Sequence, residues 1–141
     1  ALPGLRGVGL AGTARARGAT WMDSHLPAAF ATLAGLGAEL SLHKVCSTLD
    51  SSPAIGSIGR AVELARDSFA AGWSPVLAAA PPLGRWQAFG TLFATGPGGI
   101  HRLDRHPIMS RHPATPMDEA DVARHLARQT TGAVSALTLP D

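Results

Sequence analysis

The densest group of side chains that could do chemistry is the segment Lys44–Ser52, which reads Lys-Val-Cys-Ser-Thr-Leu-Asp-Ser-Ser. It follows a segment expected to form a strand and precedes a predicted helix, so it would place hydroxyls and backbone N–H groups at a helix N-terminus, which favours an anion such as a carboxylate. Lys44 adds a positive charge, and the hydroxyls of Ser47 and Thr48 can bond to sugar hydroxyls. The alternative is a Ser/Thr-rich helix cap with Lys44 in solvent, and the pattern alone favours neither.

Two more residues could contribute to this chemistry. Arg15 follows the first apolar segment, and its guanidinium suits a bidentate contact with a carboxylate, although a surface position is commoner for an arginine. Cys46 could be a nucleophile, as in Cys/His hydrolases, if a histidine lay beside the sulfur. The alternative for Cys46 is a small core residue next to a strand, and we favour that alternative.

The glycines of Gly56–Gly59 could form a backbone nest at the start of the following helix. They are not part of a P-loop, because the Gly-x-x-x-x-Gly-Lys-Ser/Thr pattern is absent and the only lysine lies elsewhere. No segment of this chain is therefore predicted to hold the phosphates of ATP.

A second polar cluster covers residues 103–117 and contains Asp104, His106 and His112. These three residues could suggest a metal site, but their spacing matches no standard zinc pattern. Two His-Pro pairs are better suited to shaping a loop. We predict no metal, and expect a rigid loop that folds over the substrate side of the sheet.

The elements that must position these residues alternate along the chain. Buried strands are predicted over residues 5–12, 39–45, 74–80 and 134–139. Helices are predicted over residues 26–36, 58–69 and 117–130, with Thr115 and Asp118 spaced as a capping box for the last one. Residues 87–94 and 100–103 are predicted to form a hairpin around the turn 95–99. The expected fold is α/β: a mostly parallel, Rossmann-like, three-layer sheet flanked by helices, with a small β-hairpin excursion.

Composition narrows the classes of function. A length of 141 residues suits one domain, and a net charge of +2 is too small to indicate nucleic-acid binding. A single cysteine cannot form an internal disulfide, which favours a cytoplasmic protein. No apolar run approaches the ~18 residues of a membrane span, so we expect no membrane partner.

Three segments together resemble the four-carbon acid sugar kinase family, which includes 3-oxo-tetronate, threonate and erythronate kinases. They are Lys44–Thr48 followed by Gly56–Gly59, Pro81–Arg85 followed by Gly90–Phe93, and His112–Met117. Their order and spacing match over nearly the whole chain. With a cysteine at position 46, the segment looks more like that of the 3-oxo-tetronate branch than that of the threonate branch, which tends to carry Asp at this position.

The resemblance implies a kinase that phosphorylates the terminal hydroxyl of a four-carbon sugar acid, with 3-oxo-tetronate as the favoured substrate. It implies that ATP and Mg²⁺ are held by a C-terminal domain that this chain does not contain. The substrate-binding residues that it implicates are Arg15, Lys44, Val45, Cys46, Ser47 and Thr48. Asp50 is a candidate catalytic base, and a structural cap is an equal alternative.

Residues 1–141 are accordingly expected to be the sugar-acid-binding domain, without the first βα unit and its Asp-Asp-x-Thr-Gly-Ala segment. We expect such a fragment to be inactive alone. Its partners would be a small sugar acid and, as a further candidate, a second copy of the chain. The competing hypothesis is a non-catalytic module that binds a small sugar acid.

Overall fold

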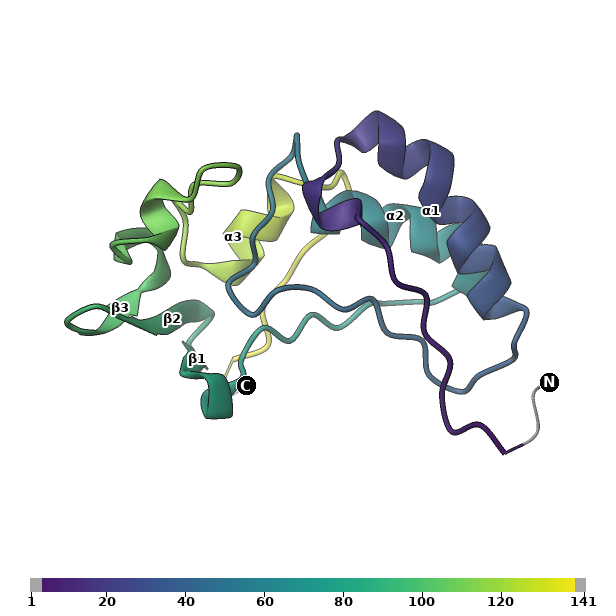
Figure 1. The fold of residues 1–141 in the computed structure, drawn as a ribbon, viewed down its shortest axis with the longest axis horizontal. Coiled ribbons are helices and arrows are strands. Elements are labelled where there is room, and N and C mark those ends of the chain that lie inside the picture. Colours follow the sequence, from purple (N-terminus) through teal and green to yellow (C-terminus); the bar gives the residue numbers. More distant parts are fainter. Residues whose placement is uncertain (1–3, 139–141) are drawn as a thin grey trace.

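The computed structural model describes residues 4–138, and helices and sheet occupy opposite ends of it (Figure 1). Helices α1, Ala19–Ala34, and α2, Ile58–Phe69, pack together at one end. The sheet lies at the other end, and α3, Val122–Ala127, lies between them. The short 3-10 helices are η1, Ala14–Ala16; η2, Pro81–Leu83; η3, Leu103–Arg105; and η4, Met109–Arg111.

Helix α1 packs on α2 through one apolar face. Met22, Leu26 and Phe30 recur every four residues and are buried against Ala61 and Leu64 of α2. This spacing places the three side chains on one side of a helix. The contact forms a core that is separate from the core around the sheet.

The predicted helix over residues 26–36 exists, but its bounds are wrong. Helix α1 begins at Ala19, runs through Pro27 and ends before Gly35. Met22, one turn before Leu26, shares the buried face, so tertiary burial extends the helix across the proline.

The helix predicted from residue 58 is confirmed as α2. The Ser57 side chain caps it by accepting a hydrogen bond from the backbone N–H of Arg60 at 3.1 Å. The helix ends at Phe69, and the C-cap residue Ala70 adopts a left-handed conformation with φ of 47°.

The sheet has three antiparallel strands in the order β1-β2-β3. Strand β1 is Arg85–Ala88, β2 is Thr91–Gly96 and β3 is Gly99–Arg102. The predicted hairpin is confirmed as β2–β3, with Phe93 opposite Arg102. The strand predicted over residues 87–94 is interrupted by the turn Phe89-Gly90, where both residues have positive φ. A phenylalanine is an unusual residue for that conformation, so the sequence carried no clear signal for this turn.

The expected mostly parallel, three-layer sheet is contradicted. Within residues 4–138 the one sheet is small and antiparallel, and the three α-helices do not form layers on its two faces (Figure 1). The segments 5–12, 39–45 and 74–80 are coil, except for an isolated bridge between Ala80 and Arg85. Residues 134–138 of the fourth predicted strand are also coil, and Leu139 lies outside the described residues.

The reason for the error is that burial and pairing of a strand are non-local. Several leucines of these segments point to solvent, with Leu40 83% and Leu137 87% exposed, although Ala78 is buried in the core around the sheet. An apolar run predicts a buried strand only if a neighbouring strand completes its hydrogen bonds. The strands that do pair are joined by two-residue turns, which bring antiparallel partners together at little loop-closure cost.

The helix predicted over residues 117–130 is also too long. Residues before Asp121 run beside β2 instead, where the Leu92 N–H donates to the Ala120 carbonyl at 2.9 Å. The cap of α3 is Asp121, whose side chain accepts from the Arg124 N–H, so the predicted capping box does not form. Pairing with β2 thus delays the start of the helix.

Within residues 4–138, none of the helices is both long enough and apolar enough to span a membrane.

Glu63 joins α2 to the end of the chain that follows α3. Its carboxylate accepts from the Thr130 hydroxyl at 2.7 Å and from the Thr131 N–H at 3.0 Å, and it pairs with Arg60. The Thr130 and Thr131 hydrogen bonds, followed by that of Arg60, lower the pKa of Glu63 from 4.5 to about 2. The ionised form is therefore the one that stabilises the fold.

Glu63→Gln is expected to lower the free energy of unfolding at pH 7 by about 1–2 kcal/mol, because charge-assisted hydrogen bonds are lost. Because the pKa of Glu63 is lowered on folding, its carboxylate stabilises the folded state fully at pH values above 4.5. This stabilisation disappears as the pH falls toward 2. Urea unfolding at several pH values should show the wild-type advantage shrinking across that window. Asp67→Asn, on the exposed side of the same helix, is the control. A difference that does not depend on pH would contradict the assignment.

Candidate functional site

A cavity of about 270 Å³ opens where three loops meet. One loop precedes and includes η1, the second contains Asp50, and the third follows η4. Its lining residues are Thr13, Arg15, Ala16, Asp50, His112, Ala114 and Thr115. The tertiary structure thus brings together residues from both polar clusters of the sequence.

The wall of this cavity contains an ion pair between Arg15 and Asp50, which are 35 residues apart in the chain. The Asp50 side chain is only 5% exposed, whereas that of Arg15 is 62% exposed. The buried carboxylate is therefore held in place, and the guanidinium covers it from the solvent side. Arginine has five N–H donors, so the contact with Asp50 leaves donors for a second anion.

Asp50 is ionised at neutral pH. Burial by itself raises the pKa of Asp50, but the hydrogen bond from Thr48 and the charge of Arg15, with smaller effects of Cys46 and His112, bring it below its ordinary value. The Thr48 hydroxyl donates to Asp50 Oδ1 at 2.6 Å. The carboxylate therefore serves as a strong hydrogen-bond acceptor at the cavity wall.

Gly56 allows the Arg15 loop to approach the Asp50 loop. Its φ is 61°, and a Cβ at this position would overlap the carbonyl oxygen of Arg15. The Gly56 N–H donates to the Arg17 carbonyl at 2.8 Å, and a bridge joins Gly18 to Ile55. The glycine therefore has a positioning role for Arg15.

The predicted anion nest at the start of α2 is not open to a ligand. The Ile58 N–H donates to Gln129 Oε1 at 2.8 Å, and the Arg60 N–H donates to the Ser57 hydroxyl. Both donors have partners within the protein.

The third wall of the cavity contains His112. Its Nδ1 accepts from the Thr115 N–H at 3.2 Å and lies 3.0 Å from the Thr115 hydroxyl. Since Nδ1 is an acceptor, the neutral ring carries its proton on Nε2. His112, Thr115 and Thr13 were not among the predicted site residues. The His-Pro-Ala-Thr-Pro-Met segment marked the loop, but no local pattern showed which of its side chains would line the cavity.

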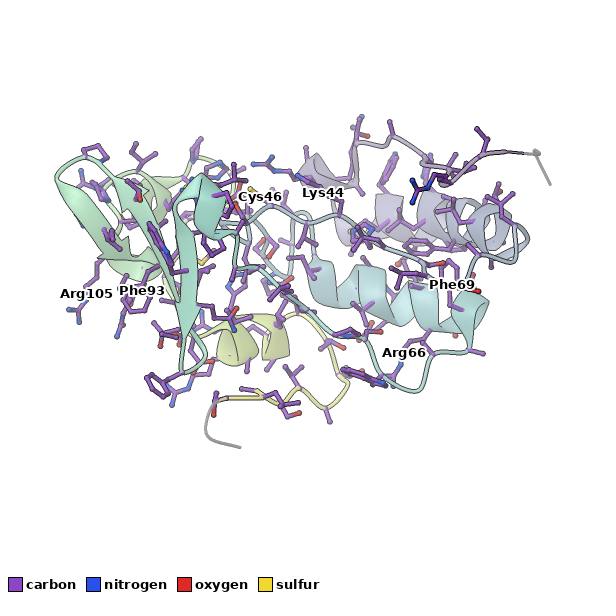
Figure 2. All side chains as sticks on the ribbon, turned by 90° about the horizontal axis from the view of Figure 1, so that it is seen from below. Lys44, Cys46, Arg66, Phe69, Phe93 and Arg105 are labelled. Atoms are coloured by element: carbon purple, nitrogen blue, oxygen red, sulfur yellow. The ribbon has the colours of Figure 1, made fainter. Side chains whose placement is uncertain are left out.

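The structure brings some of the predicted site residues together and not others. Arg15, Thr48 and Asp50 are in contact, and Cys46 Sγ lies 3.0 Å from the Thr48 hydroxyl. Lys44 is exposed on the coil between the helical end and the sheet end, beside Cys46 (Figure 2). The remaining two are half-buried: Val45 packs against the core around the sheet, and Ser47 lies in the turn before Thr48. Of the predicted site residues, Arg15 and Asp50 line the cavity, and the segment 44–48 does not.

The sulfur of Cys46 contacts a hydroxyl group, whereas the nucleophile of a Cys/His hydrolase contacts a histidine. The hydrogen-bond partner of Cys46 is Thr48, and Cys46 also helps to lower the pKa of Asp50. Within residues 4–138 no histidine makes a hydrogen bond with its sulfur. The base that a Cys/His hydrolase requires is therefore not in position.

The histidines of the second cluster serve separate purposes. His106 is buried, and its Nδ1 accepts from the N–H groups of Ile108 and Met109. Asp104 pairs with Arg102. The part of the chain between residues 4 and 138 contains no group of three or more His, Cys, Asp or Glu side chains that could hold a metal ion.

A second cavity of about 270 Å³ lies beside the sheet and α3. Its walls are charged, but every one of these charges is in an ion pair. Arg102 pairs with Asp104 and Arg124 with Asp121, and Arg128, outside the lining, pairs with both Asp118 and Glu119. It contains none of the predicted site residues, so the Arg15–Asp50 cavity is the better candidate for ligand binding.

Residues 3–141 match a family described as the sugar-binding N-terminal domain. The sequence is 52% identical over 137 residues, 97% of this chain, to a 3-oxo-isoapionate kinase of Paraburkholderia graminis. It is 34% identical over 110 residues, 78% of this chain, to a 3-oxo-tetronate kinase of Burkholderia multivorans. This chain spans 29% and 24% of the lengths of these two relatives.

Two solved structures have a similar fold. Haemophilus influenzae protein HI1011 matches with a TM-score of 0.72 and 26% identity, over 84% of this chain and 27% of that protein. A protein from Salmonella typhimurium described as a putative tRNA synthase matches with a TM-score of 0.74 and 27% identity, over the same shares of the two chains.

Proposed function

We propose that this chain, which belongs to the family of sugar-binding N-terminal domains, forms the sugar-acid-binding part of an ATP-dependent kinase. The resemblance to four-carbon acid sugar kinases is confirmed by that family and by the two kinase relatives. The proposed substrate is 3-oxo-tetronate or a closely related 3-oxo sugar acid. The names of both relatives support this class of substrate.

The observation that carries the proposal is the pairing of Arg15 with a buried, ionised Asp50 at the wall of a small cavity. A sugar acid has a carboxylate at one end and hydroxyls along its length. Of the two neighbouring protein groups, the arginine can bind the substrate carboxylate and the aspartate can accept a hydrogen bond from a substrate hydroxyl. The volume of about 270 Å³ is just below the usual ~300–1,000 Å³ of ligand pockets, which suits a short molecule.

In the proposed complex, Arg15 binds the substrate carboxylate, and Asp50 accepts a hydrogen bond from a substrate hydroxyl. His112, which also lines the cavity, has Nε2–H as a further donor. The segment that contains Lys44, Val45, Cys46 and Ser47 is proposed to complete the binding site, with Thr48 holding Asp50.

Asp50 is proposed to orient the reacting hydroxyl rather than to remove its proton. A general base works best with a pKa near the working pH, and the pKa of Asp50 lies below its ordinary value. Phosphoryl transfer depends mainly on alignment and charge neutralisation, which ATP-bound Mg²⁺ supplies. We place ATP and Mg²⁺ on a further domain of the protein, and expect this chain alone not to turn over substrate.

The test is a kinase assay on the full-length protein with ATP and Mg²⁺. It should form ADP and a phosphate ester, seen by ³¹P NMR, with 3-oxo-tetronate or 3-oxo-isoapionate. Arg15→Gln should raise KM about 10- to 100-fold through loss of a charge-assisted contact. Arg17→Gln is the matched control, since Arg17 lies on the same loop, binds Thr13 and covers Trp21, outside the cavity lining.

Phosphate transfer to neither acid would contradict the kinase proposal. Equal KM values for wild type, Arg15→Gln and Arg17→Gln would contradict the site instead. Binding of either acid without transfer would favour the non-catalytic binding module.

A further inference from the structure

A buried polar cluster begins at the residue after Asp50 and does not line the cavity. Its members are Ser51, His125 and Gln129, which are 2%, 6% and 7% exposed. The atoms Ser51 Oγ, His125 Nε2 and Gln129 Nε2 form a triangle with 2.9 Å between each pair. Ser51 and His125 are 74 residues apart, so the cluster joins the Asp50 loop to α3.

The cluster holds a turn in an unfavourable backbone conformation. Leu49 has φ of 49°, a value that a residue with a Cβ adopts only when its surroundings enforce it. Its side chain is buried in the core around the sheet, and its carbonyl accepts from the Ser51 hydroxyl at 2.8 Å. Asp50 lies between these two anchored residues, so their positions set the direction of its carboxylate.

A neutral His125 is compatible with all of these contacts. The Ser51 hydroxyl has two acceptors within reach, the Leu49 carbonyl at 2.8 Å and His125 Nε2 at 2.9 Å, and the amide nitrogen of Gln129 donates to Ser51 Oγ and to His125 Nε2. The other end of the amide is fixed, because Gln129 Oε1 accepts from the first N–H of α2, that of Ile58. His125 Nε2 is therefore an acceptor, which requires a neutral ring.

Protonation of His125 is incompatible with this arrangement. A proton on Nε2 would face the NH₂ group of Gln129, and the amide cannot reverse without leaving the Ile58 N–H unpaired. Burial lowers the pKa of His125, which favours the neutral ring. The charged or polar groups that act on it are the Leu49 carbonyl, Asp118 and Glu119, which raise the pKa, and Arg128, which lowers it.

We infer that His125 and Gln129 are positioning residues for the Asp50 carboxylate. They hold the turn 49–51 and so keep Asp50 against Thr48 and Arg15 at the cavity wall. The part that concerns ligand affinity rests on the proposed function, whereas the position of Asp50 can be measured without a ligand. Because neutral His125 is required, the site is intact above the ordinary histidine pKa of 6.5 and is released as the pH falls through the lowered pKa.

The first experiment follows the carboxyl carbon of Asp50 by ¹³C NMR titration in the full-length protein. His125→Phe removes the acceptor for Gln129 and should raise the pKa of Asp50 toward its ordinary value, because the turn releases it from Thr48 and Arg15. His125→Gln can place an amide oxygen near the Nε2 position and should preserve the wild-type titration. His106→Phe is the matched control, since it removes an equally buried ring that holds a different turn.

The second experiment measures the affinity for erythronate, a chemically stable four-carbon acid, as a function of pH. His125→Phe should weaken binding roughly 10-fold at pH 7, the effect of one lost contact to a charged group. Wild type should lose affinity as His125 becomes protonated, and His125→Gln should remain unaffected over that range because it cannot be protonated.

The two experiments separate the possible failures. If His125→Phe lowers the melting temperature but leaves the Asp50 titration unchanged, the cluster only stabilises the fold and the inference is wrong. Acid-dependent loss of affinity that persists in His125→Gln would overturn the role of its protonation. If wild type does not bind erythronate while the Asp50 titration responds as expected, the positioning role stands and the proposed substrate class fails.

Discussion

Asp50→Asn is expected to reduce kcat/KM for the 3-oxo sugar acid about 100-fold in the full-length protein, through loss of a charged acceptor worth up to ~3 kcal/mol. Asparagine has nearly the same shape and can still accept from Thr48, so the turn should persist. The charge that pairs with Arg15 disappears, and the substrate hydroxyl loses its acceptor. Steady-state kinetics with varied acid at saturating ATP measures the effect.

Asp104→Asn is the matched control for Asp50→Asn. Asp104 also pairs with an arginine, Arg102, but at the second cavity. Its replacement should leave kcat/KM within about twofold of wild type, because surface ion pairs contribute little. Equal losses in the two variants would mean that Asp50 has no special place in the site.

Gly56→Ala is expected to lower the free energy of unfolding by about 2–4 kcal/mol, from backbone strain and overpacking together. Glycine at this position has φ of 61°, and a methyl group would overlap the Arg15 carbonyl. The loop that carries Arg15 must move away, so the protein that remains folded should also bind the sugar acid more weakly. Urea unfolding followed by circular dichroism measures the stability change.

Gly72→Ala provides the comparison for Gly56→Ala. A Cβ at Gly72 meets no atom within 4 Å, and its φ is not positive. Its stability should stay within about 0.5 kcal/mol of wild type, as for ordinary surface substitutions. If the two alanine variants unfold at the same urea concentration, the close approach of Arg15 to Gly56 is not present in solution.

Asp50→Asn and Gly56→Ala both disrupt the Arg15–Asp50 ion pair. Asp50→Asn removes the buried partner of the pair, whereas Gly56→Ala displaces the exposed partner. Both should weaken sugar-acid binding, but only the glycine variant should lose much stability. Comparing kinetics and unfolding for both variants therefore distinguishes damage to the site from damage to the fold.

Part of the candidate site was predictable from the sequence. Arg15, Thr48 and Asp50 were identified as candidates by residue type and motif, and they are in contact. Lys44 shares the motif, but its side chain is exposed outside the cavity lining. A motif identifies a segment and cannot tell which of its side chains face a loop from another part of the chain.

The sequence by itself determined the elements whose causes are local. Helix α2 follows from its Ser57 cap and apolar spacing, and the β2–β3 hairpin follows from the Pro97-Gly98 turn between two short strands. The family resemblance was equally available, since it depends on the order of motifs along the chain. Each of these depends on residues that are close together or simply ordered in the sequence.

Only the tertiary structure decided which segments meet. It left the segments 5–12 and 39–45 as coil instead of strands, joined Arg15 to Asp50, and brought His125 into contact with Ser51. Strand pairing, burial of a carboxylate and the choice of a histidine tautomer all depend on partners that are distant in sequence. Local patterns carry no information about such partners, which is why the predicted fold class was wrong although helix α2 and the β2–β3 hairpin were predicted correctly.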